Sequence, residues 1–257
     1  MPVCGRLTVL AALAFTLLSG AARADSTMTF VVDPFPPFTY EENGAAAGPM
    51  SDTVRAVCEA IKVQCKLEVY PWRRALKLAE DGYVDGIYAI VDIPERRQFF
   101  YVTPPIIDSG YAVFVHKSST LTYHQPSDLA GYTVGAFGPS AASRAVDELA
   151  RAVPTLRTLI EVDNVTLLKK LSSMRYGERG AAFANVDVGN YLVKQENIAD
   201  LRVAGVVSKT AYSIGLSRAK VSEQRAQEFM TALRKLVKAG KVRETADKYG
   251  VVAPAAN

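Results

Sequence analysis

Short apolar runs alternate with amphipathic segments of helical length along almost the whole chain. Within residues 51–62 the apolar side chains recur at i, i+3, i+4 and i+7, the spacing of one helix face. Strand runs separated by helix-length crossovers predict an α/β fold. The expected strands are 28–33, 66–70, 84–91, 111–116, 133–137, 158–162, 181–185, 202–207 and 212–216. The expected helices are 51–62, which Ser51 or Asp52 can cap, 72–80, 140–153, 165–174, 188–195, 222–239 and 241–248.

The N-terminus has the pattern of an export signal. Arg6 precedes an apolar run, Leu7 to Leu18, and Ala22-Arg23-Ala24 follows with the small-x-small pattern of a cleavage site. We therefore predict a cleaved signal peptide over residues 1–24 and an exported, soluble mature chain in the periplasm. The alternative is an uncleaved membrane anchor, for which the apolar run is short.

Charge and length set further limits. The formal net charge of the whole sequence is +4, and the expected signal peptide carries two of the basic residues and no acidic one, so the balance does not suggest a nucleic-acid partner. The length allows two lobes. A polar, aperiodic stretch at 116–131 marks the passage into the second lobe, and 208–217 is the expected return strand. We predict a first lobe of residues 25–116 plus 209–257, and an inserted second lobe of residues 117–208.

Cys58 and Cys65 are the only cysteines after the expected signal peptide. An even count in an exported protein favours a disulfide, here between the end of a helix and the next strand. Two buried free thiols are the alternative.

Polar groups follow three of the expected strands, where ligands sit in open α/β sheets. The first group is VDIPERR, in which Asp92 and Glu95 have capping-box spacing and Arg96 and Arg97 follow in the first helical turn. A cation there opposes the helix dipole, whereas a guanidinium binds a carboxylate in bidentate fashion. One arginine is therefore a candidate carboxylate clamp, and a surface ion pair with Asp92 or Glu95 is the alternative.

The other two groups lie farther along the chain. In GAFGPSAAS, Ser140 opens a helix whose N–H groups are able to receive an anion without a metal. In AAFANVDVGN, Asp187 lies between a strand and a helix and is able to accept from a ligand ammonium. Both residues are equally compatible with a simple role as helix caps.

Two aromatic residues are candidates for the walls of a binding pocket, and the sequence lacks the common catalytic motifs. Phe35, in DPFPPFTY, and Trp72, the single tryptophan, are candidate pocket walls, although such rings also serve as core. The sequence has no HExxH, GxSxG or phosphate-binding GxxxxGKS motif. We therefore predict no catalytic residue, no metal site and no cofactor.

Six segments in this order resemble the family 3 extracellular solute-binding proteins, the periplasmic partners of amino-acid ABC transporters. They are PFPPFTY, RALKLAEDGYVDGIYAIVDIPERRQFFYVTPP, SDLAGYTVGAFGPS, AAFANVDVGNYLV, AYSIGLS and LRKLVKAGKVRETADKYG. The resemblance covers essentially the whole chain after the signal peptide. It implies the type II periplasmic-binding fold, in which two α/β lobes are joined by two crossing strands and close on the ligand by a hinge motion. The two cysteines resemble the disulfide of histidine- and lysine/arginine/ornithine-binding members.

The resemblance also implies roles for individual residues. Arg96 matches the clamp of the ligand α-carboxylate, Ser140 the second carboxylate site, Asp187 the acid that receives the α-ammonium, and Phe35 a ring against the ligand. Members that bind amino acids usually have serine or threonine where this chain has Val91, a position that would also face the ligand. The missing hydroxyl removes an acceptor for the ammonium, a bond worth roughly 1.5 to 3 kcal/mol.

The function expected from these features is capture of an amino acid or a similar small carboxylate-bearing solute, with delivery to a membrane ABC permease by a monomeric protein. A first alternative is a periplasmic dehydratase acting on a cyclic carboxylic acid, with Asp92, Glu41 or Glu42 as its acid or base. A second alternative is a subunit that reports the ligand to a membrane receptor.

Overall fold

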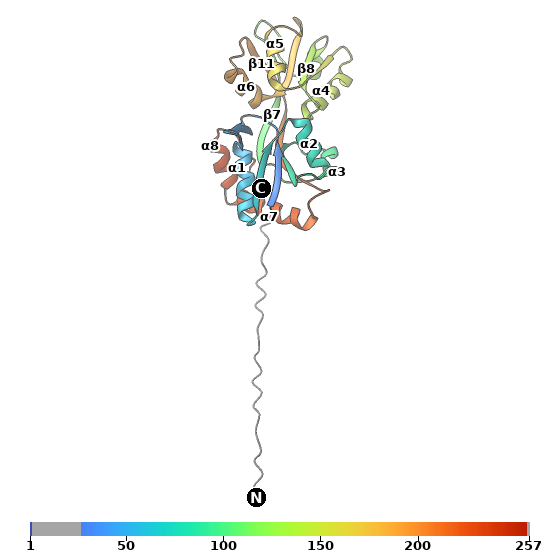
Figure 1. The fold of residues 1–257 in the computed structure, drawn as a ribbon. Coiled ribbons are helices and arrows are strands. Elements are labelled where there is room, and N and C mark those ends of the chain that lie inside the picture. Colours follow the sequence, from blue (N-terminus) through green and yellow to red (C-terminus); the bar gives the residue numbers. More distant parts are fainter. Residues whose placement is uncertain (2–26, 256–257) are drawn as a thin grey trace.

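The computed structural model of the protein describes Met1 and residues 27–255. The predicted signal peptide therefore lies, apart from Met1, outside the described residues. Figure 1 shows two lobes, one above the other, with β7 running between them. Among the described residues no helix combines the length and apolar character that a membrane crossing requires.

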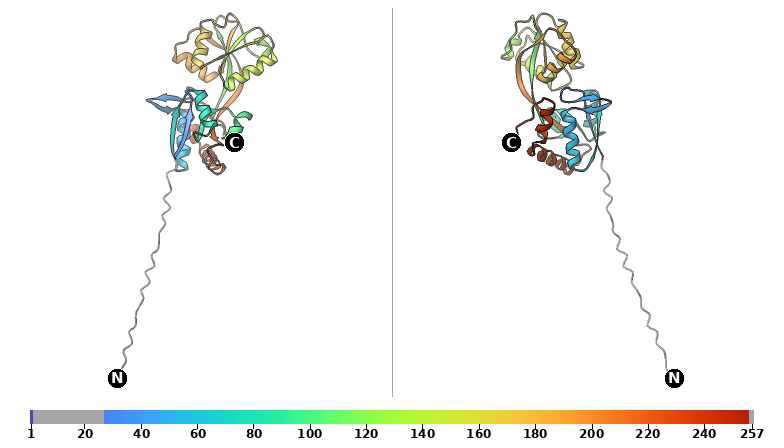
Figure 2. Two further views of the ribbon diagram at one scale, coloured as in Figure 1. Left: turned by 45° about the vertical axis from the view of Figure 1, so that its right-hand side comes forward. Right: turned by 90° about the vertical axis from the view of Figure 1, so that its left-hand side faces the viewer.

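The first lobe is built on a sheet that contains β1, the first strand of the described chain. Strand β1 (Thr27–Val32) pairs in parallel with β4 (Gln64–Val69) and β5 (Gly86–Ile90), and β6 (Phe100–Val102) pairs with the last strand of the chain. Its helices are α1 (Pro49–Ala60), α2 (Trp72–Glu80), α3 (Pro94–Phe99), α7 (Glu223–Lys238) and α8 (Lys241–Lys248). The C-terminal helices α7 and α8 contact α1, so they pack in the same lobe as the first helix of the described chain (Figure 2).

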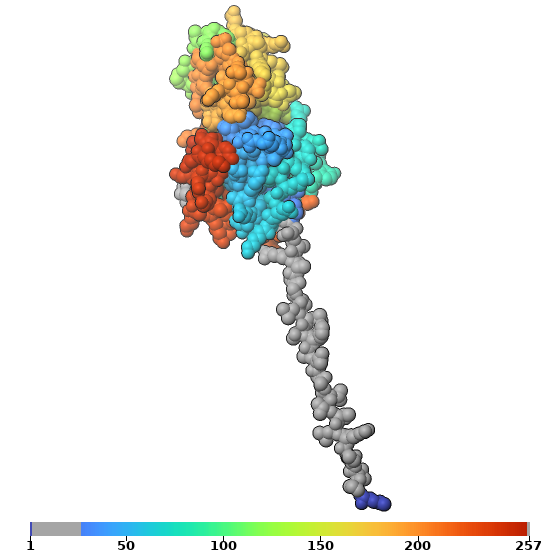
Figure 3. Space-filling model, turned by 60° about the vertical axis from the view of Figure 1, so that its left-hand side comes forward, coloured from blue at the N-terminus to red at the C-terminus, as the bar shows by residue number. Residues whose placement is uncertain are grey.

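The second lobe repeats the α/β arrangement. Strands β8 (Thr133–Phe137), β9 (Arg157–Glu161) and β10 (Gly180–Asn185) are parallel to one another, with β8 in the middle. The 3₁₀ turn η1 (Pro126–Leu129) leads into β8, and the helices are α4 (Ala141–Ala152), α5 (Asn164–Ser172) and α6 (Val186–Gln195). In Figure 3 the blue segment that carries the hairpin β2 (Tyr40–Glu42) and β3 (Ala45–Ala47) lies directly beneath this lobe.

Two long strands connect the lobes. Strand β7 (Ile107–His116) and strand β11 (Leu201–Ser217) are antiparallel over their shared length, from the Leu201–His116 pair to the Tyr212–Ile107 pair. Beyond that point β11 pairs with β5 of the first lobe, whereas residues 111–115 of β7 pair along the other edge with β10 of the second lobe. The predicted two-lobed fold with two crossing strands is therefore confirmed. The predicted division at 116/117 falls at the end of β7 and that at 208/209 falls inside β11; where the lobes separate stays a prediction.

Several local predictions were wrong. The strands expected at 202–207 and 212–216 belong to one strand, β11, because the polar residues between them continue to pair with β7. The expected return strand 208–217 is the C-terminal half of β11. Helix α1 begins at Pro49, two residues before the predicted start, and neither Ser51 nor Asp52 caps it. Ser51 is instead buried, where its hydroxyl donates to the carbonyl of Ala47 and contacts the hydroxyl of Tyr88. The hairpin β2–β3 and strand β6 were not predicted.

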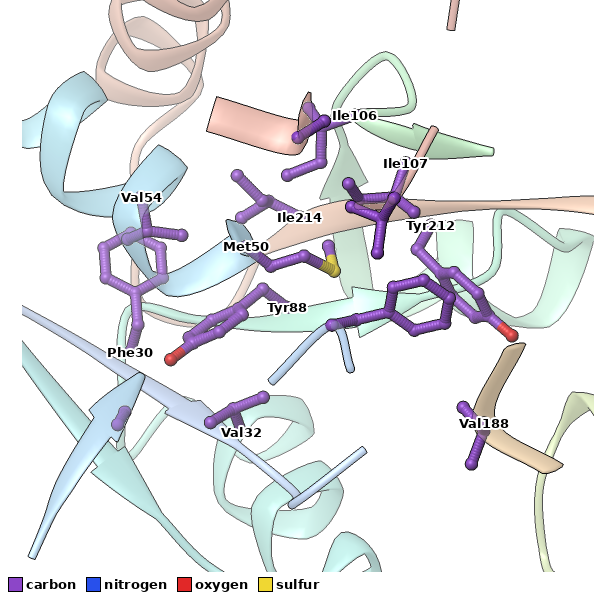
Figure 4. Close-up of a cluster of buried hydrophobic side chains, with 14 of the residues drawn as sticks. Phe30, Val32, Met50, Val54, Tyr88, Ile106, Ile107, Val188, Tyr212 and Ile214 are labelled. Carbon is purple, nitrogen blue, oxygen red and sulfur yellow. The ribbon is translucent and has the colours of Figure 1, made fainter. Parts of the chain in front are cut away.

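The core of the first lobe extends to the strands that connect the lobes. Figure 4 shows part of this cluster, with Phe30, Met50 and Tyr88 from the first lobe beside Tyr212 from β11. The predicted disulfide is confirmed: Cys58 near the end of α1 is bonded to Cys65 at the start of β4.

Candidate functional site

A cavity lies between the two lobes, beside the connecting strands. Its empty volume is about 630 Å³, including the part that opens to solvent. Both lobes line it, together with Tyr111 of β7 and Tyr212 of β11. The first lobe contributes Asp33, Phe35, Trp72, Tyr88, Ala89, Val91, Ile93 and Arg96, and the second contributes Phe137, Ser140, Ala141, Ala142, Asn164 and Asn185.

Five of the six predicted ligand-binding residues line this one cavity. They come from separate parts of the chain and are Phe35, Trp72, Val91, Arg96 and Ser140. The rule that ligands sit beyond the carboxyl ends of strands explains why they meet, since each lies within six residues of the end of the preceding strand. The sixth residue, Asp187, does not line the cavity. That any of them binds a ligand stays a prediction.

Arg96 is the one arginine or lysine that lines the cavity in the described part of the chain. Its side chain is 13% exposed, and its Nη1 donates to Glu80 Oε1 at 3.0 Å. The guanidinium carbon lies 5.3 Å from the centre of the Trp72 ring. Burial lowers the pKa of Arg96 and raises that of Glu80, although the ion pair opposes both shifts. A guanidinium has five N–H donors, so this pairing leaves Arg96 able to bind a carboxylate.

Arg97 has a different environment. Its side chain is 67% exposed and makes a bidentate ion pair with Asp92, at 2.7 and 2.8 Å. The capping box predicted for Asp92 and Glu95 is absent, because Ile93 is the N-cap of α3 and Asp92 is taken by Arg97. Of the two neighbouring arginines, Arg97 therefore has the surface ion pair and Arg96 lines the cavity.

Ser140 caps α4. A helix cap was one of the two roles predicted for it, and an anion site was the other. Its Oγ accepts from the N–H groups of Ala142 and Ser143 and donates to the carbonyl of Phe137 at 2.6 Å. The hydroxyl is therefore occupied. In the described chain the N–H of Ala141 is the group in this first turn that has no partner, and it is the donor that this helix end offers to an anion.

The end of β10 presents Asn185, and not Asp187, to the cavity. Asn185 is the last residue of the strand and caps α6, whereas Asp187 lies in the first turn of that helix. The Oδ2 of Asp187 receives the Ser109 hydroxyl at 2.5 Å, outside the cavity. Sequence reasoning selected the acid after this strand and missed the amide two residues earlier. The strand-end rule alone would have selected Asn185.

Asp33 is the one carboxyl group among the residues that line the cavity. It follows β1 directly and was not predicted. Burial raises its pKa to about 7, against the opposing effect of a hydrogen bond from the backbone N–H of Trp72. Near neutral pH this carboxyl is therefore present in both its neutral and its charged form.

Hydrogen bonds and an ion pair connect the two lobes close to the cavity wall at Trp72. The Nε1 of Trp72 donates to the carbonyl of Pro139 at 2.7 Å, and Arg73 donates to that of Gly138 at 3.2 Å. Glu95 of α3 forms an ion pair with Arg144 of α4 at 2.7 Å. Trp72 is thus both a wall of the cavity and a contact between lobes.

The acids that an enzyme on this scaffold was expected to use lie elsewhere. Asp92, Glu41 and Glu42 do not line the cavity, although Glu41 borders an outer groove that adjoins it through Asp33 and Trp72. Within the described residues there is no group of three His, Cys, Asp or Glu side chains arranged to hold a metal ion.

Comparisons with known proteins agree with this architecture. The family model described as bacterial extracellular solute-binding proteins, family 3, matches residues 28–252. No curated protein sequence matches the chain.

Solved structures with the same fold include three of interest. A histidine kinase sensor domain with similarity to periplasmic binding proteins has a TM-score of 0.80 and 19% identity, over 90% of this chain and 100% of that one. An ancestral arginine-binding protein bound to arginine has a TM-score of 0.76 and 20% identity, over 88% and 98%. The arginine-, lysine-, histidine-binding protein ArtJ from Geobacillus stearothermophilus has a TM-score of 0.74 and 21% identity, over 89% and 97%.

Proposed function

The chain belongs to the bacterial extracellular solute-binding proteins of family 3, and from this premise we propose that it captures a small carboxylate-bearing solute between its lobes. The observation that carries the proposal is Arg96, a largely buried guanidinium beside Trp72 in a mostly apolar cavity. A cation in such a place is costly unless an anion meets it. Glu80 supplies one anion. The ligand carboxylate is the second, and it accepts hydrogen bonds from the N–H groups of Arg96 that Glu80 does not use.

The remaining contacts follow from the positions of the lining groups. The N–H of Ala141 at the start of α4 is a second donor to the carboxylate, in agreement with the dipole of that helix. Phe35 and Trp72 cover the apolar part of the solute, and Phe35 is itself held by an edge contact to Tyr212, with ring centres 5.3 Å apart. We further propose that the closed, loaded protein delivers the solute to an ABC permease.

A thermal-shift screen tests the capture proposal. The protein is unfolded and refolded to remove any carried ligand, and is then screened against amino acids, polyamines, small dicarboxylates and cyclic acids. A ligand at about 1,000 times its dissociation constant adds about 4 kcal/mol, or roughly 8 to 16 °C for a chain of this size. Each active acid is compared with its neutral carboxamide. We expect the acid to shift the melting temperature and the amide not to; equal shifts for both would refute a carboxylate clamp.

Asp33 supports a second candidate, an enzyme on the same scaffold. A carboxyl whose pKa is about 7 is suited to proton transfer near neutral pH. Incubation of the protein with each acid that binds, followed by mass spectrometry, would reveal turnover. A new product that disappears in Asp33→Asn would favour the enzyme over the binding protein.

The likeness to a histidine kinase sensor domain gives a third candidate, a subunit that reports the solute to a receptor. Uptake of the labelled solute by cells with and without the gene separates the two roles. Delivery to a permease predicts that uptake falls without the protein, whereas a sensor leaves uptake by an already expressed permease unchanged.

A further inference from the structure

The side-chain amide of Asn185 has no hydrogen-bonding capacity left for a ligand. Its Nδ2 donates to the hydroxyls of Ser109, at 2.7 Å, and Tyr212, at 2.9 Å. Its Oδ1 accepts from the backbone N–H groups of Asp187, at 3.0 Å, and Val188, at 2.9 Å. An amide has two donor hydrogens and a carbonyl with two acceptor sites, and all four are used. The residue is only 3% exposed.

The orientation of this amide is fixed by its neighbours. Turning it over would place the NH₂ group against the two backbone N–H groups of α6, donor against donor. Ser109 lies on β7 and Tyr212 on β11, so Asn185 is bonded to both strands that connect the lobes. The edge that Asn185 presents to the cavity is therefore neither a free donor nor a free acceptor.

The cavity also gains no free side-chain acceptor for an α-ammonium from Asp187, Val91 or Ser140. Asp187 borders a surface depression with Ser109 and Lys209, and its carboxylate already accepts from Ser109. Val91 does line the cavity, but it has no hydroxyl. The hydroxyl of Ser140 is taken by the first turn of α4.

Asp33 does not replace them. It is the one carboxyl among the described lining residues, and burial favours its neutral form up to a pH of about 7. An ammonium ion beside Asp33 would have to favour the ionised carboxylate against the burial that raises its pKa. The neutral carboxyl is better suited to a hydroxyl, an amide or another neutral polar group of the ligand.

We propose that the solute is a carboxylate that has no α-ammonium group. This inference rests on the proposed function, because it requires Arg96 to hold the carboxylate. Neither Asn185 nor Val91 offers an ammonium next to that carboxylate an acceptor that would replace its water. The lost interaction corresponds to about 10- to 100-fold in affinity.

Matched pairs of acids test the proposal on the refolded wild-type protein by calorimetric titration. Each pair consists of an L-amino acid and the acid that has hydrogen in place of the ammonium group. The probes are phenylalanine with hydrocinnamate, leucine with isocaproate, glutamate with glutarate, and histidine with imidazolepropionate. The side chain is the same within a pair, so the ratio of the two dissociation constants measures the effect of the ammonium group on affinity.

We expect the acid without ammonium to bind at least about tenfold more tightly in every pair that binds. An amino acid that binds as tightly as its partner, or more tightly, overturns the inference but leaves carboxylate capture intact. If no member of any pair binds, and no acid of the thermal-shift screen does either, the proposed function fails and the inference fails with it.

Two variants test whether the missing acceptors set this preference. Val91→Thr supplies a hydroxyl with little change in volume, and Asn185→Asp supplies a carboxylate that retains the acceptor for the N–H groups of α6. We expect each to reduce the preference for the acid without ammonium by roughly tenfold. Asn185→Asp also loses two donated bonds, so its melting curve is recorded and Val91→Thr serves as the milder variant. An unchanged preference in Val91→Thr and in folded Asn185→Asp would overturn the assignment.

Discussion

At the scale of single residues, Asp33 links the cavity to the stability of the protein. Burial raises its pKa from 3.8 to about 7. Between these values the folded state binds more protons at this group than the unfolded state does. The free energy of unfolding therefore falls as the pH rises through this interval, and the contribution of Asp33 becomes most unfavourable above pH 7.

We predict that Asp33→Asn stabilises the protein in a pH-dependent way. Asparagine keeps an acceptor for the N–H of Trp72 and carries no charge, so the variant avoids the cost of ionising a buried carboxyl. The gain over wild type is expected to be small near pH 4 and to reach about 2 to 4 kcal/mol at pH 8. Urea unfolding of both proteins at several pH values measures it. Parallel curves for the two proteins would show that Asp33 is not perturbed.

The candidate site shows which residue-level features a sequence reveals. Arg96 and Ser140 could be found because each follows a strand and carries a recognisable anion-binding pattern. Asn185 was missed because an acid two residues later drew the prediction, and only the three-dimensional structure shows that α6 begins between them. Asp33 satisfies the strand-end rule, but its raised pKa depends on burial by distant segments.

At the scale of elements, the Cys58–Cys65 bond joins α1 to β4 over a sequence separation of 7 residues. Replacing both cysteines by serine is expected to lower the free energy of unfolding by about 2.5 kcal/mol, because the short loop is no longer closed in the unfolded chain. The melting temperature should fall by about 5 to 10 °C. Ligand affinity should be unchanged, since neither cysteine lines the cavity. A melting temperature equal to that of wild type would contradict a stabilising bond.

The fold was predictable where local pattern and tertiary structure agree. The periodicity of 72–80 and 241–248 predicted α2 and α8 with the observed bounds, and 133–137 predicted β8. The continuity between the predicted strand 202–207 and the expected return strand 208–217 was missed because Ser208, Lys209 and Thr210 are polar. Their backbones nevertheless pair with Gly110, Ser109 and neighbouring residues of β7, a long-range interaction that polarity does not reveal. The short strands of β2, β3 and β6 are too brief to show a period.

At the scale of the whole molecule, the cavity depends on both lobes. Arg96, Trp72 and Asp33 belong to the first, and Ser140 and Asn185 to the second. The Trp72–Pro139 hydrogen bond and the Glu95–Arg144 ion pair join the two lobes. Opening the cleft would break these contacts and separate the two halves of the site. Ligand binding and closure are therefore expected to be coupled.

The central claim is that Arg96 holds the carboxylate of a solute enclosed between the lobes. Trp72 is the only tryptophan in the sequence and lines the cavity, so its fluorescence reports binding directly. The most direct test is a fluorescence titration of wild type, Arg96→Ala and Arg97→Ala with the acid that gives the largest thermal shift. Arg97→Ala is the matched control, because it removes the adjacent, exposed guanidinium.

We predict a saturable change in emission for wild type and Arg97→Ala with affinities within about twofold, and a loss of at least about 100-fold in Arg96→Ala. Melting curves confirm that each variant is folded. Wild-type affinity in folded Arg96→Ala, or an equal loss in Arg97→Ala, would contradict the account.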